Sequence, residues 1–368
     1  MTNCQLLGAF AAALLCSAFL QGCGQQDSHP PSPSPAPPPA PTVRLRSGAN
    51  MPVISAGTWQ YDDATAEASV EAALAAGFSH IDTANDYGNQ QGVGRAIKKS
   101  GKPRKSLFIT TKVPGCGLQN VSGSSVEECR NDTSARLAED LKQLDLTYVD
   151  LMLIHFPPCP GGDGSAKSPA QVTCFAQKTG CSDPKSCDLV RAQWSVLTEA
   201  YNKKQALSIG VSNYCSACFQ CLEAEKGVIM PMVNQVQYHV GMHPDPQGFK
   251  TFAEQHDMVL QAWSPLGSGG HGSAELLKGN LTTSIGRKHG KSSVQIALKW
   301  IVSRNVSVAT KSSNPEHLRE DLDIFDFDLD HEDLQALDTA DFAAKDTPSF
   351  LCSDPQPHLV PQVDQVVI

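Results

Sequence analysis

The sequence predicts an α/β protein built as a (β/α)8 TIM barrel, and three observations support this prediction. From residue 42 onward, eight short apolar runs alternate with stretches that have the periodicity of amphipathic helices. One run, Leu-Met-Leu-Ile at 151–154, is apolar on both faces, as in a strand that is covered on both sides. No Gly-x-Gly-x-x-Gly motif follows the first strand, which argues against a doubly wound sheet, the alternative fold.

The expected elements start with a small hairpin at 42–53, and the barrel strands follow it. Strands are expected at 53–57, 78–82, 107–112, 149–155, 207–212, 233–237, 258–263 and 306–311. Helices are expected between them, at 64–76, 134–144, 190–204, 246–256 and 292–304. The acidic stretch at 320–338 is interpreted as a solvated helix face with its capping residues.

Residues 1–41 are expected to lie outside this fold. The apolar run at 6–20 has the length of a signal peptide and is short for a membrane span, so 1–24 is interpreted as a signal-like leader. The Leu-Gln-Gly-Cys sequence that ends at Cys23 resembles a lipoprotein cleavage box, although residues 1–5 contain no Lys or Arg. Residues 25–41 form a Pro/Ser-rich linker, and 42–368 is the barrel domain. The leader predicts the secretory pathway or a membrane tether, with a plastid or another organelle as the alternative.

The net charge and the strand ends limit the kind of chemistry. The 368-residue chain has a formal net charge of −9 and no basic cluster, which argues against nucleic acid as a partner. In such barrels the active site lies where the strands end. Asp82, Lys112 and His155 end three of the expected strands, and Tyr87 follows the first of these.

Each of these four residues alone has a plainer interpretation, as a cap, a solvated cation or a core histidine. Together they can polarise a carbonyl group and deliver a proton to it. A tyrosine has an ordinary pKa of about 10, and a neighbouring Lys112 ammonium would favour phenolate character in Tyr87. Asp82 would keep that lysine charged and positioned, and His155 would orient the carbonyl by a hydrogen bond.

The motifs around these residues resemble those of the aldo-keto reductase family over nearly all of 42–345. The matches occur in order: GTW (57–59), GFSHIDTANDYGNQQGVGRAI (77–97), ITTKV (109–113), YVDLMLIHFP (148–157), IGVSNY (209–214), NQVQYH (234–239), WSPLGSG (263–269) and TKSSNPEHLRED (310–321). The resemblance implies a (β/α)8 barrel and NADPH-dependent reduction of aldehydes or ketones to alcohols by hydride transfer, without a metal. It makes Tyr87 the general acid, assisted by Lys112 and Asp82, with His155 positioning the carbonyl.

The resemblance also implies cofactor-binding positions. These are Thr58, Asp82, Ser212, Asn213, Gln235, Trp263, Ser264, Leu266, Ser268, Lys311, Ser312 and His317. Within this set, the carboxamide would bind Ser212, Asn213 and Gln235. Trp263 would stack on the nicotinamide, and Ser264, Leu266 and Ser268 would line the pyrophosphate. Lys311 and Ser312 would receive the 2′-phosphate.

Two residues depart from the family pattern at the phosphate end. His317 replaces a usual Arg, and Asp321 replaces a usual Asn. Because neutral histidine is a poorer partner for phosphate and aspartate repels it, we expect NADPH with a weakened preference over NADH. The substrate would contact Trp59, Tyr87, His155 and Phe156. Phe156 replaces a frequent Trp, which leaves room for a modestly sized aldehyde or ketone.

A second function remains open at this point. Potassium-channel β-subunits show that the fold can serve as an NADPH-binding redox sensor or regulatory subunit, and the leader would bring such a subunit to a membrane. The small-molecule carbonyl is nevertheless the expected partner, and the chain is expected to be a monomer.

Thirteen cysteines are many for a cytosolic enzyme, and with a leader in front they predict disulfides of unknown connectivity. The loops at 114–131 and 157–188, which contain Cys116, Cys129, Cys159, Cys174, Cys181 and Cys187, follow barrel strands. We therefore hypothesise a disulfide-pinned lid over the substrate mouth. The Cys-x-x-Cys-x-x-Cys run at 215–221 has a spacing that could indicate an iron–sulfur or zinc site. No fourth ligand has a recognisable spacing, so free thiols on a helix or a disulfide are the preferred interpretation.

Overall fold

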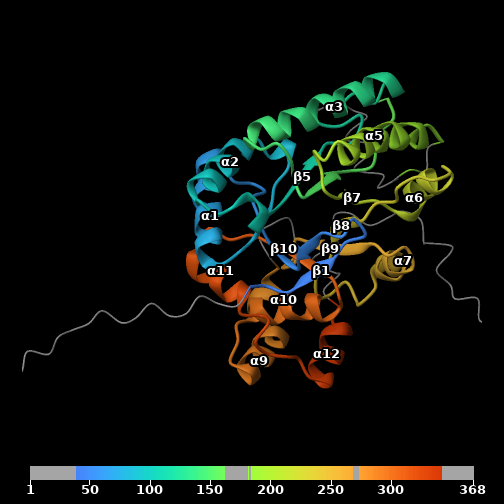
Figure 1. Cartoon of the computed structure of the whole chain (residues 1–368). Coiled ribbons are helices and arrows are strands. Elements are labelled where there is room, and N and C mark those ends of the chain that lie inside the picture. Colours follow the sequence, from blue (N-terminus) through green and yellow to red (C-terminus); the bar gives the residue numbers. More distant parts are fainter. Residues whose placement is uncertain (1–38, 162–180, 182–183, 268–272, 342–368) are drawn as a thin grey trace, which may run out of the picture. The chain divides into compact units, whose positions relative to one another are not determined.

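The computed structural model describes residues 39–161, 181, 184–267 and 273–341. Within them, eight parallel strands close into a barrel in the order β10-β3-β4-β5-β6-β7-β8-β9 (Figure 1). The strands are β3 (Ile54–Gly57), β4 (His80–Asp82), β5 (Phe108–Val113), β6 (Leu151–Ile154), β7 (Ile209–Ser212), β8 (Val233–Gln237), β9 (Val259–Trp263) and β10 (Ser307–Thr310). The predicted barrel is confirmed, and each strand overlaps the run expected for it.

Helices follow the strands along the chain. They are α1 (Asp63–Ala76), α2 (Gln90–Lys99), α3 (Val126–Gln143), α5 (Pro184–Asn202), α6 (Ser216–Glu223), α7 (Phe249–Gln255), α8 (Ala274–Lys278), α9 (Asn280–His289), α10 (Ser293–Ser303), α11 (Pro315–Leu322) and α12 (His331–Asp338). Short 3-10 turns are η1 (Asn85–Tyr87), η2 (Arg104–Ser106) and η3 (Pro246–Gly248).

Local chemistry sets the helix ends. Asp62 caps α1 by accepting the Thr65 N–H at 2.7 Å, and Gly77 ends it in the left-handed region with a φ of 118°. The helix expected at 134–144 starts earlier, at Val126, because the Ser125 side chain accepts the N–H of Glu128 and caps it there. Side-chain capping thus lengthens a helix that apolar periodicity alone placed too late.

The acidic stretch at 320–338 behaves as predicted only in part. Asp330 caps α12 by accepting the N–H of Asp333 at 2.9 Å. The side chains of Asp321 and Asp333 are buried, however, so this stretch is not simply a solvated face.

The N-terminal hairpin closes one end of the barrel. β1 (Thr42–Arg44) pairs antiparallel with β2 (Asn50–Pro52), which confirms the predicted hairpin. Its Met51 and the neighbouring Leu45 pack in one apolar cluster with Phe108, Leu151 and Val233, which start three barrel strands. The amino-terminal end of the barrel is therefore filled, and the carboxyl-terminal end of the strands is left for a binding site.

The predicted leader at 1–24 and most of the predicted linker at 25–41 lie outside the described residues. Among the helices that are described, none is both long enough and apolar enough to cross a bilayer.

Candidate active site

The structure brings the four predicted catalytic residues together at the carboxyl-terminal end of the barrel. Asp82 ends β4, Lys112 lies in β5, His155 follows β6, and Tyr87 ends the η1 turn. The Lys112 Nζ lies 2.5 Å from Asp82 Oδ1 and 3.4 Å from the Tyr87 hydroxyl. The Tyr87 and His155 rings meet edge to face, with centroids 5.6 Å apart. The four side chains, which come from the ends of three strands and from the η1 turn, therefore lie together in one site.

The lysine at this point is fully buried and fully compensated. Besides Asp82, Lys112 donates to the Thr83 carbonyl oxygen at 2.9 Å. The second oxygen of Asp82 accepts a hydrogen bond from Gln235 Nε2 at 2.7 Å. A buried ion pair tolerates its desolvation only when its remaining hydrogen-bonding groups are satisfied, as they are here. The Lys112–Asp82 ion pair is thus a fixed support beside the Tyr87 hydroxyl.

Tyr87 is held as a protonated phenol. Burial raises its pKa well above 10, and the negative charges of Asp82 and Asp86 raise it further. The expectation that Lys112 gives Tyr87 phenolate character is therefore wrong for this arrangement, because the lysine charge is already paired with Asp82. The phenol retains the proton that a general acid must donate.

Asp86 is a site residue that the sequence analysis missed. It precedes Tyr87 in η1, and its Oδ1 lies 2.8 Å from His155 Nδ1. Burial raises the pKa of Asp86, but the charge and hydrogen bond of His155, together with the charge of Lys112, outweigh burial and lower it below its ordinary value. The signal was available, because a carboxylate stands directly beside the predicted catalytic tyrosine.

The turn that carries Tyr87 is anchored from behind by α3. Asp140 Oδ1 accepts hydrogen bonds from Asn85 Nδ2 at 2.6 Å and from Gln90 Nε2 at 2.7 Å. Thr111, next to Lys112 in β5, donates to Gln90 Oε1 at 2.6 Å. Burial raises the pKa of Asp140 to about 8, so this carboxyl is mostly protonated at neutral pH. This network was also not predicted from the sequence.

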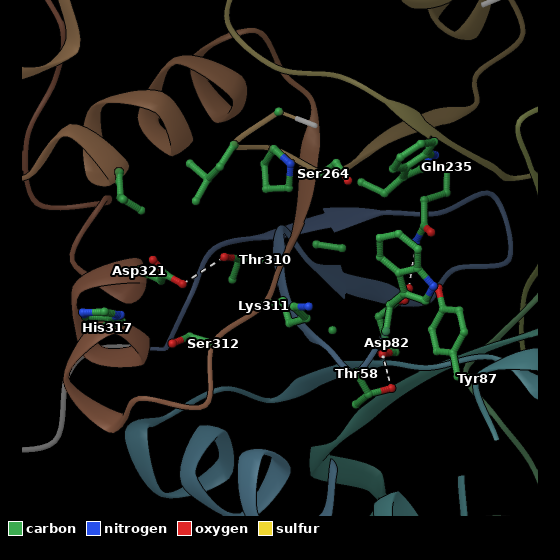
Figure 2. Close-up of a pocket in the computed structure, with 18 of the residues that line it drawn as sticks. Thr58, Asp82, Tyr87, Gln235, Ser264, Thr310, Lys311, Ser312, His317 and Asp321 are labelled. Carbon is green, nitrogen blue, oxygen red and sulfur yellow. Dashed lines mark hydrogen bonds between the residues drawn. The ribbon is translucent and has the colours of Figure 1, made fainter. Parts of the chain in front are cut away.

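A cavity of about 840 Å³ runs from Asp82, Tyr87 and His155 to the start of α11, and the fully buried Lys112 does not line it. Figure 2 shows Tyr87 and Gln235 at one end, Lys311 between, and Ser312, His317 and Asp321 at the other end. The predicted cofactor positions that line it are Thr58, Asp82, Asn213, Gln235, Trp263, Ser264, Leu266, Lys311, Ser312 and His317. Ser268 lies outside the described residues.

The amide end of this cavity is preorganised by hydrogen bonds among the predicted residues. Asn213 Nδ2 donates to the His155 carbonyl oxygen at 3.0 Å, and Trp263 Nε1 donates to Asn213 Oδ1 at 2.9 Å. Ser212 differs from the prediction in one respect: it is not among the lining residues, and its hydroxyl donates to the Gln235 carbonyl oxygen at 2.7 Å. Ser212 therefore supports Gln235 from behind.

The far end carries a cation beside a carboxyl whose charge is reduced. Lys311 Nζ donates to Gln60 Oε1 at 3.2 Å and lies 5.0 Å from the Tyr61 ring centroid. Burial raises the pKa of Asp321 to about 7, and Thr310 Oγ1 donates to this carboxyl at 2.9 Å. The repulsion expected between Asp321 and a phosphate is therefore weakened, because burial favours the neutral form of this carboxyl.

The predicted substrate residues lie at the mouth and wall of the same cavity. Trp59 is 39% exposed, and Phe156 stacks on His155 with ring centroids 4.4 Å apart. Gln119, from the loop after β5, also lines the cavity and was not predicted individually. An elongated cavity with amides at one end, Lys311 between and Ser312 and His317 at the other end fits a dinucleotide, with space beside Tyr87 for a small carbonyl compound.

The barrel and this constellation define a (β/α)8-barrel oxidoreductase that acts on carbonyl groups. The chain belongs to the aldo/keto reductase family, whose family model matches residues 53–341. It is 33% identical to an aldehyde reductase of Saccharomyces cerevisiae over 286 residues, which cover 77% of this chain and 86% of the yeast protein. It is 32% identical to a glyoxal reductase of Bacillus subtilis, with 81% and 91% covered.

Solved structures agree with this assignment. The crystal structure of an aldo/keto reductase from Brucella melitensis superposes with a TM-score of 0.65 at 34% identity, covering 81% of this chain and 98% of that one. The family match and these structures confirm the resemblance that the sequence motifs predicted. Members of this family are oxidoreductases that use nicotinamide cofactors.

All eight described cysteines are disulfide-bonded, as the cysteine count predicted. Cys116 bonds Cys129, Cys181 bonds Cys218, and Cys187 bonds Cys221. Cys159 and Cys215 are disulfide-bonded as well. In the Cys-x-x-Cys-x-x-Cys run the disulfide interpretation therefore holds, and the described residues contain no group suited to a metal.

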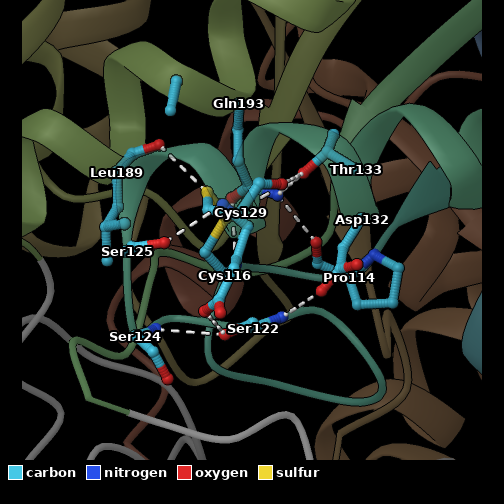
Figure 3. The surroundings of a disulfide bond; sticks show 12 residues. Pro114, Cys116, Ser122, Ser124, Ser125, Cys129, Asp132, Thr133, Leu189 and Gln193 are labelled. Atoms are coloured by element: carbon cyan, nitrogen blue, oxygen red, sulfur yellow. Dashed lines mark hydrogen bonds between the residues drawn. A yellow bond between two sulfur atoms is a disulfide. The ribbon is translucent and has the colours of Figure 1, made fainter.

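The predicted lid divides into a described part and a part outside the described residues. Around Cys116–Cys129, Gln193 of α5 accepts the Cys116 N–H at 3.0 Å and donates to the Pro114 carbonyl oxygen at 2.9 Å (Figure 3). This pinned loop reaches the cavity through Gln119. Most of 157–188, including Cys174, lies outside the described residues. Cys181 and Cys187 form disulfide bonds with two cysteines of α6.

Proposed function

We propose that this chain reduces small aldehydes or ketones to alcohols with NADPH, and that Tyr87 is the general acid. The observation that carries the proposal is the position of the Tyr87 hydroxyl, which lies beside the Lys112–Asp82 pair and His155 in the cavity that Gln235 and Trp263 also line. Its raised pKa keeps the proton that a general acid needs. NADPH, when bound, would supply the hydride.

The chain's own residues would divide the remaining work. Gln235 and Asn213 would hold the carboxamide, and Trp263 would cover the ring face. His155 would orient the substrate carbonyl, so that Tyr87 can deliver its proton to the carbonyl oxygen. Phe156 and Trp59 would exclude water from the reacting atoms. Lys311 and Ser312 would bind the 2′-phosphate, with a limited preference over NADH because His317 adds a charge only when protonated.

The test is aldehyde-dependent NADPH oxidation by the wild type and by Tyr87→Phe. We expect kcat to fall by roughly 100- to 10,000-fold, the range for loss of a general acid, with an unchanged NADPH Kd and an unchanged free energy of unfolding. Turnover by the variant at the wild-type rate would contradict the role of Tyr87. NADPH binding without turnover of any aldehyde or ketone would instead favour the redox-sensor or regulatory role.

We also propose that the barrel domain at 42–368 follows a cleaved or membrane-tethering leader at 1–24 and a linker at 25–41, and works in the secretory pathway as a monomer. The disulfide bonding of every described cysteine supports an oxidising compartment, because cytosolic thiols are kept reduced. The sequons at Asn120, Asn131, Asn280 and Asn305 are all exposed. Imaging of the full-length chain with a C-terminal tag tests this, and cytosolic or plastid signal would contradict it. Size-exclusion chromatography tests the monomer.

A further inference from the structure

The contact between His155 and Asp86 has no role in the catalytic scheme proposed for this chain. Asp86 comes from the η1 turn and His155 from the end of β6, and both line the cavity. Their Nδ1 and Oδ1 atoms lie 2.8 Å apart, and each side chain is only 9% exposed. A contact this short and this buried fixes the ring that faces the substrate position.

The chemistry of the pair fixes where one imidazole hydrogen lies. An ionised carboxylate can only accept hydrogen bonds, so His155 Nδ1 must be the donor. The lowered pKa of Asp86 keeps this carboxyl ionised at neutral pH. The other ring nitrogen, Nε2, has no hydrogen-bond partner among the described residues, and His155 lines the cavity. Nε2 is therefore left for a ligand.

This arrangement makes the behaviour of Nε2 depend on the protonation of the ring. With a hydrogen already on Nδ1, Nε2 donates a hydrogen bond only when the imidazole carries both protons. When the imidazole carries one proton, Nε2 is an acceptor. A carbonyl oxygen needs a donor, whereas an alcohol hydroxyl can also supply a hydrogen to an acceptor. The carbonyl compound therefore binds Nε2 only when the ring carries both protons, whereas the alcohol can bind either state of the ring.

We propose that Asp86 is a positioning residue that keeps a hydrogen on Nδ1 of His155, so that Nε2 donates to the carbonyl compound only when the ring carries both protons, whereas the alcohol binds either form of the ring. The part of this inference that concerns ligands rests on the proposed carbonyl reduction. The part that concerns the ring itself does not.

The other charged groups around the ring are compensated among the described residues. Lys112 from β5 is paired with Asp82 from β4 at 2.5 Å, and Tyr87 from η1 is a protonated phenol. The remaining contacts are neutral: Phe156 stacks on the ring, and Asn213 donates to the His155 carbonyl oxygen. Asp86 is thus the one described carboxylate that contacts the imidazole directly.

The first experiment reads the tautomer and needs no turnover. Long-range ¹H–¹⁵N NMR of the ¹⁵N-labelled protein reports which ring nitrogen carries the hydrogen, with the His155 signals assigned by their loss in His155→Asn. At alkaline pH, where the imidazole is neutral, we expect the Nδ1–H form in the wild type and the Nε2–H form in Asp86→Ala. A wild-type ring in the Nε2–H form would overturn the proposal, even if no variant folds.

The chain offers a matched control in a second histidine–carboxylate pair. His256 Nε2 lies 2.9 Å from Glu223 Oε1 on the surface, away from the cavity residues. Glu223→Ala removes a carboxylate from a histidine in the same way as Asp86→Ala, so it should leave the His155 tautomer unchanged. A tautomer change in both variants would show that the effect is not specific to Asp86, and would also overturn the proposal.

The second experiment measures binding of two ligands that differ only at the reacting group. Benzaldehyde is titrated into the NADP⁺ complex and benzyl alcohol into the NADPH complex, at acidic, neutral and alkaline pH. In the wild type we expect benzaldehyde affinity to fall with pH by about 3- to 10-fold, the effect of one hydrogen bond. Benzyl alcohol affinity should change by about twofold or less, because its hydroxyl can accept from or donate to Nε2. In Asp86→Ala the change in benzaldehyde affinity should also shrink to about twofold or less.

The outcomes of the two experiments separate the inference from the proposed function. If neither ligand binds the wild-type complexes but the Nδ1–H tautomer is found, the proposed function fails and the role of Asp86 stands. If both ligands bind with pH profiles that Asp86→Ala does not change, the role of Asp86 is overturned and the proposed function stands.

Discussion

The two ends of the cavity differ in how their charges are compensated. At the Tyr87 end, Lys112 is paired with Asp82, and His155 with Asp86, before any ligand arrives. At the α11 end, Lys311 contacts the neutral Gln60 and the Tyr61 ring, and no described residue pairs with the exposed His317. At the Tyr87 end the charges are compensated within the folded protein, whereas at the α11 end they would be compensated by the charge of a bound ligand. Substitutions should therefore damage folding at the first end and ligand choice at the second.

The largest expected effect comes from removing the buried cation at the Tyr87 end. Lys112→Met leaves Asp82 charged and buried without its partner, which should lower the free energy of unfolding by about 3–5 kcal/mol. Urea denaturation measures this loss. Adding Asp82→Asn should restore part of the stability, because no uncompensated charge then remains. A loss below about 1 kcal/mol for Lys112→Met alone would show that the ion pair does not support this end of the cavity.

The next effect concerns the anchor behind Tyr87 and depends on pH. The pKa of Asp140 is about 8 in the folded protein and near its ordinary 3.8 when unfolded. Between these values the folded state binds more protons, so stability should fall as pH rises from about 4 to about 8, by at most ~1.4 kcal/mol per pH unit.

Asp140→Asn keeps an acceptor for Asn85 and Gln90 but cannot ionise. Urea unfolding at pH 5 and pH 8 should therefore show a smaller loss of stability with pH in this variant than in the wild type. Equal losses in the two proteins would contradict the raised pKa of Asp140.

At the α11 end, Lys311→Met should act on the ligand and leave folding intact. Losing a charged hydrogen bond should weaken NADPH binding by about 10- to 100-fold. NADH affinity should change by about twofold or less, since NADH lacks the 2′-phosphate. Fluorescence titration with both cofactors measures the difference, and urea unfolding should match the wild type. An equal loss for NADPH and NADH would place the phosphate elsewhere.

The smallest effect is a gain at the exposed histidine. His317→Arg supplies a permanent planar cation and should tighten NADPH binding by about 3- to 10-fold, with no change for NADH. His317→Gln, which is neutral at every pH, is the control and should leave the NADPH Kd at pH 8 unchanged. Tighter binding of NADH by the arginine variant would show that the gain does not come from the phosphate.

Features that depend only on position along the strands could be predicted from the sequence. In a parallel barrel the carboxyl-terminal strand ends meet at one rim, so Asp82, Lys112 and His155 could be placed together from their strands alone. The disulfide partners could not be predicted, because Cys181 and Cys218 are brought together by the packing of α5 on α6.

The charge states were the least predictable part of the site. Tyr87 remains protonated because of burial and two carboxylates, and the neutral form of Asp321 is favoured because this residue lies on the buried face of α11. Both effects come from tertiary contacts that residue identity does not contain. Asp86 could have been proposed from its position beside Tyr87, but its contact with His155 depends on the η1 turn and could not be predicted from the sequence.

The two disulfides between the start of α5 and α6 also have a mechanical consequence. They join residues with sequence separations of 37 and 34, and β7, whose Ser212 supports Gln235, lies between the joined cysteines. If the oxidised chain were pulled from its ends, the tension would pass through the sulfur atoms and bypass this segment. Roughly 100 Å of extended chain would not be released until these disulfides are reduced. β7 would thus be shielded from a pulling force that unfolds the neighbouring parts of the chain.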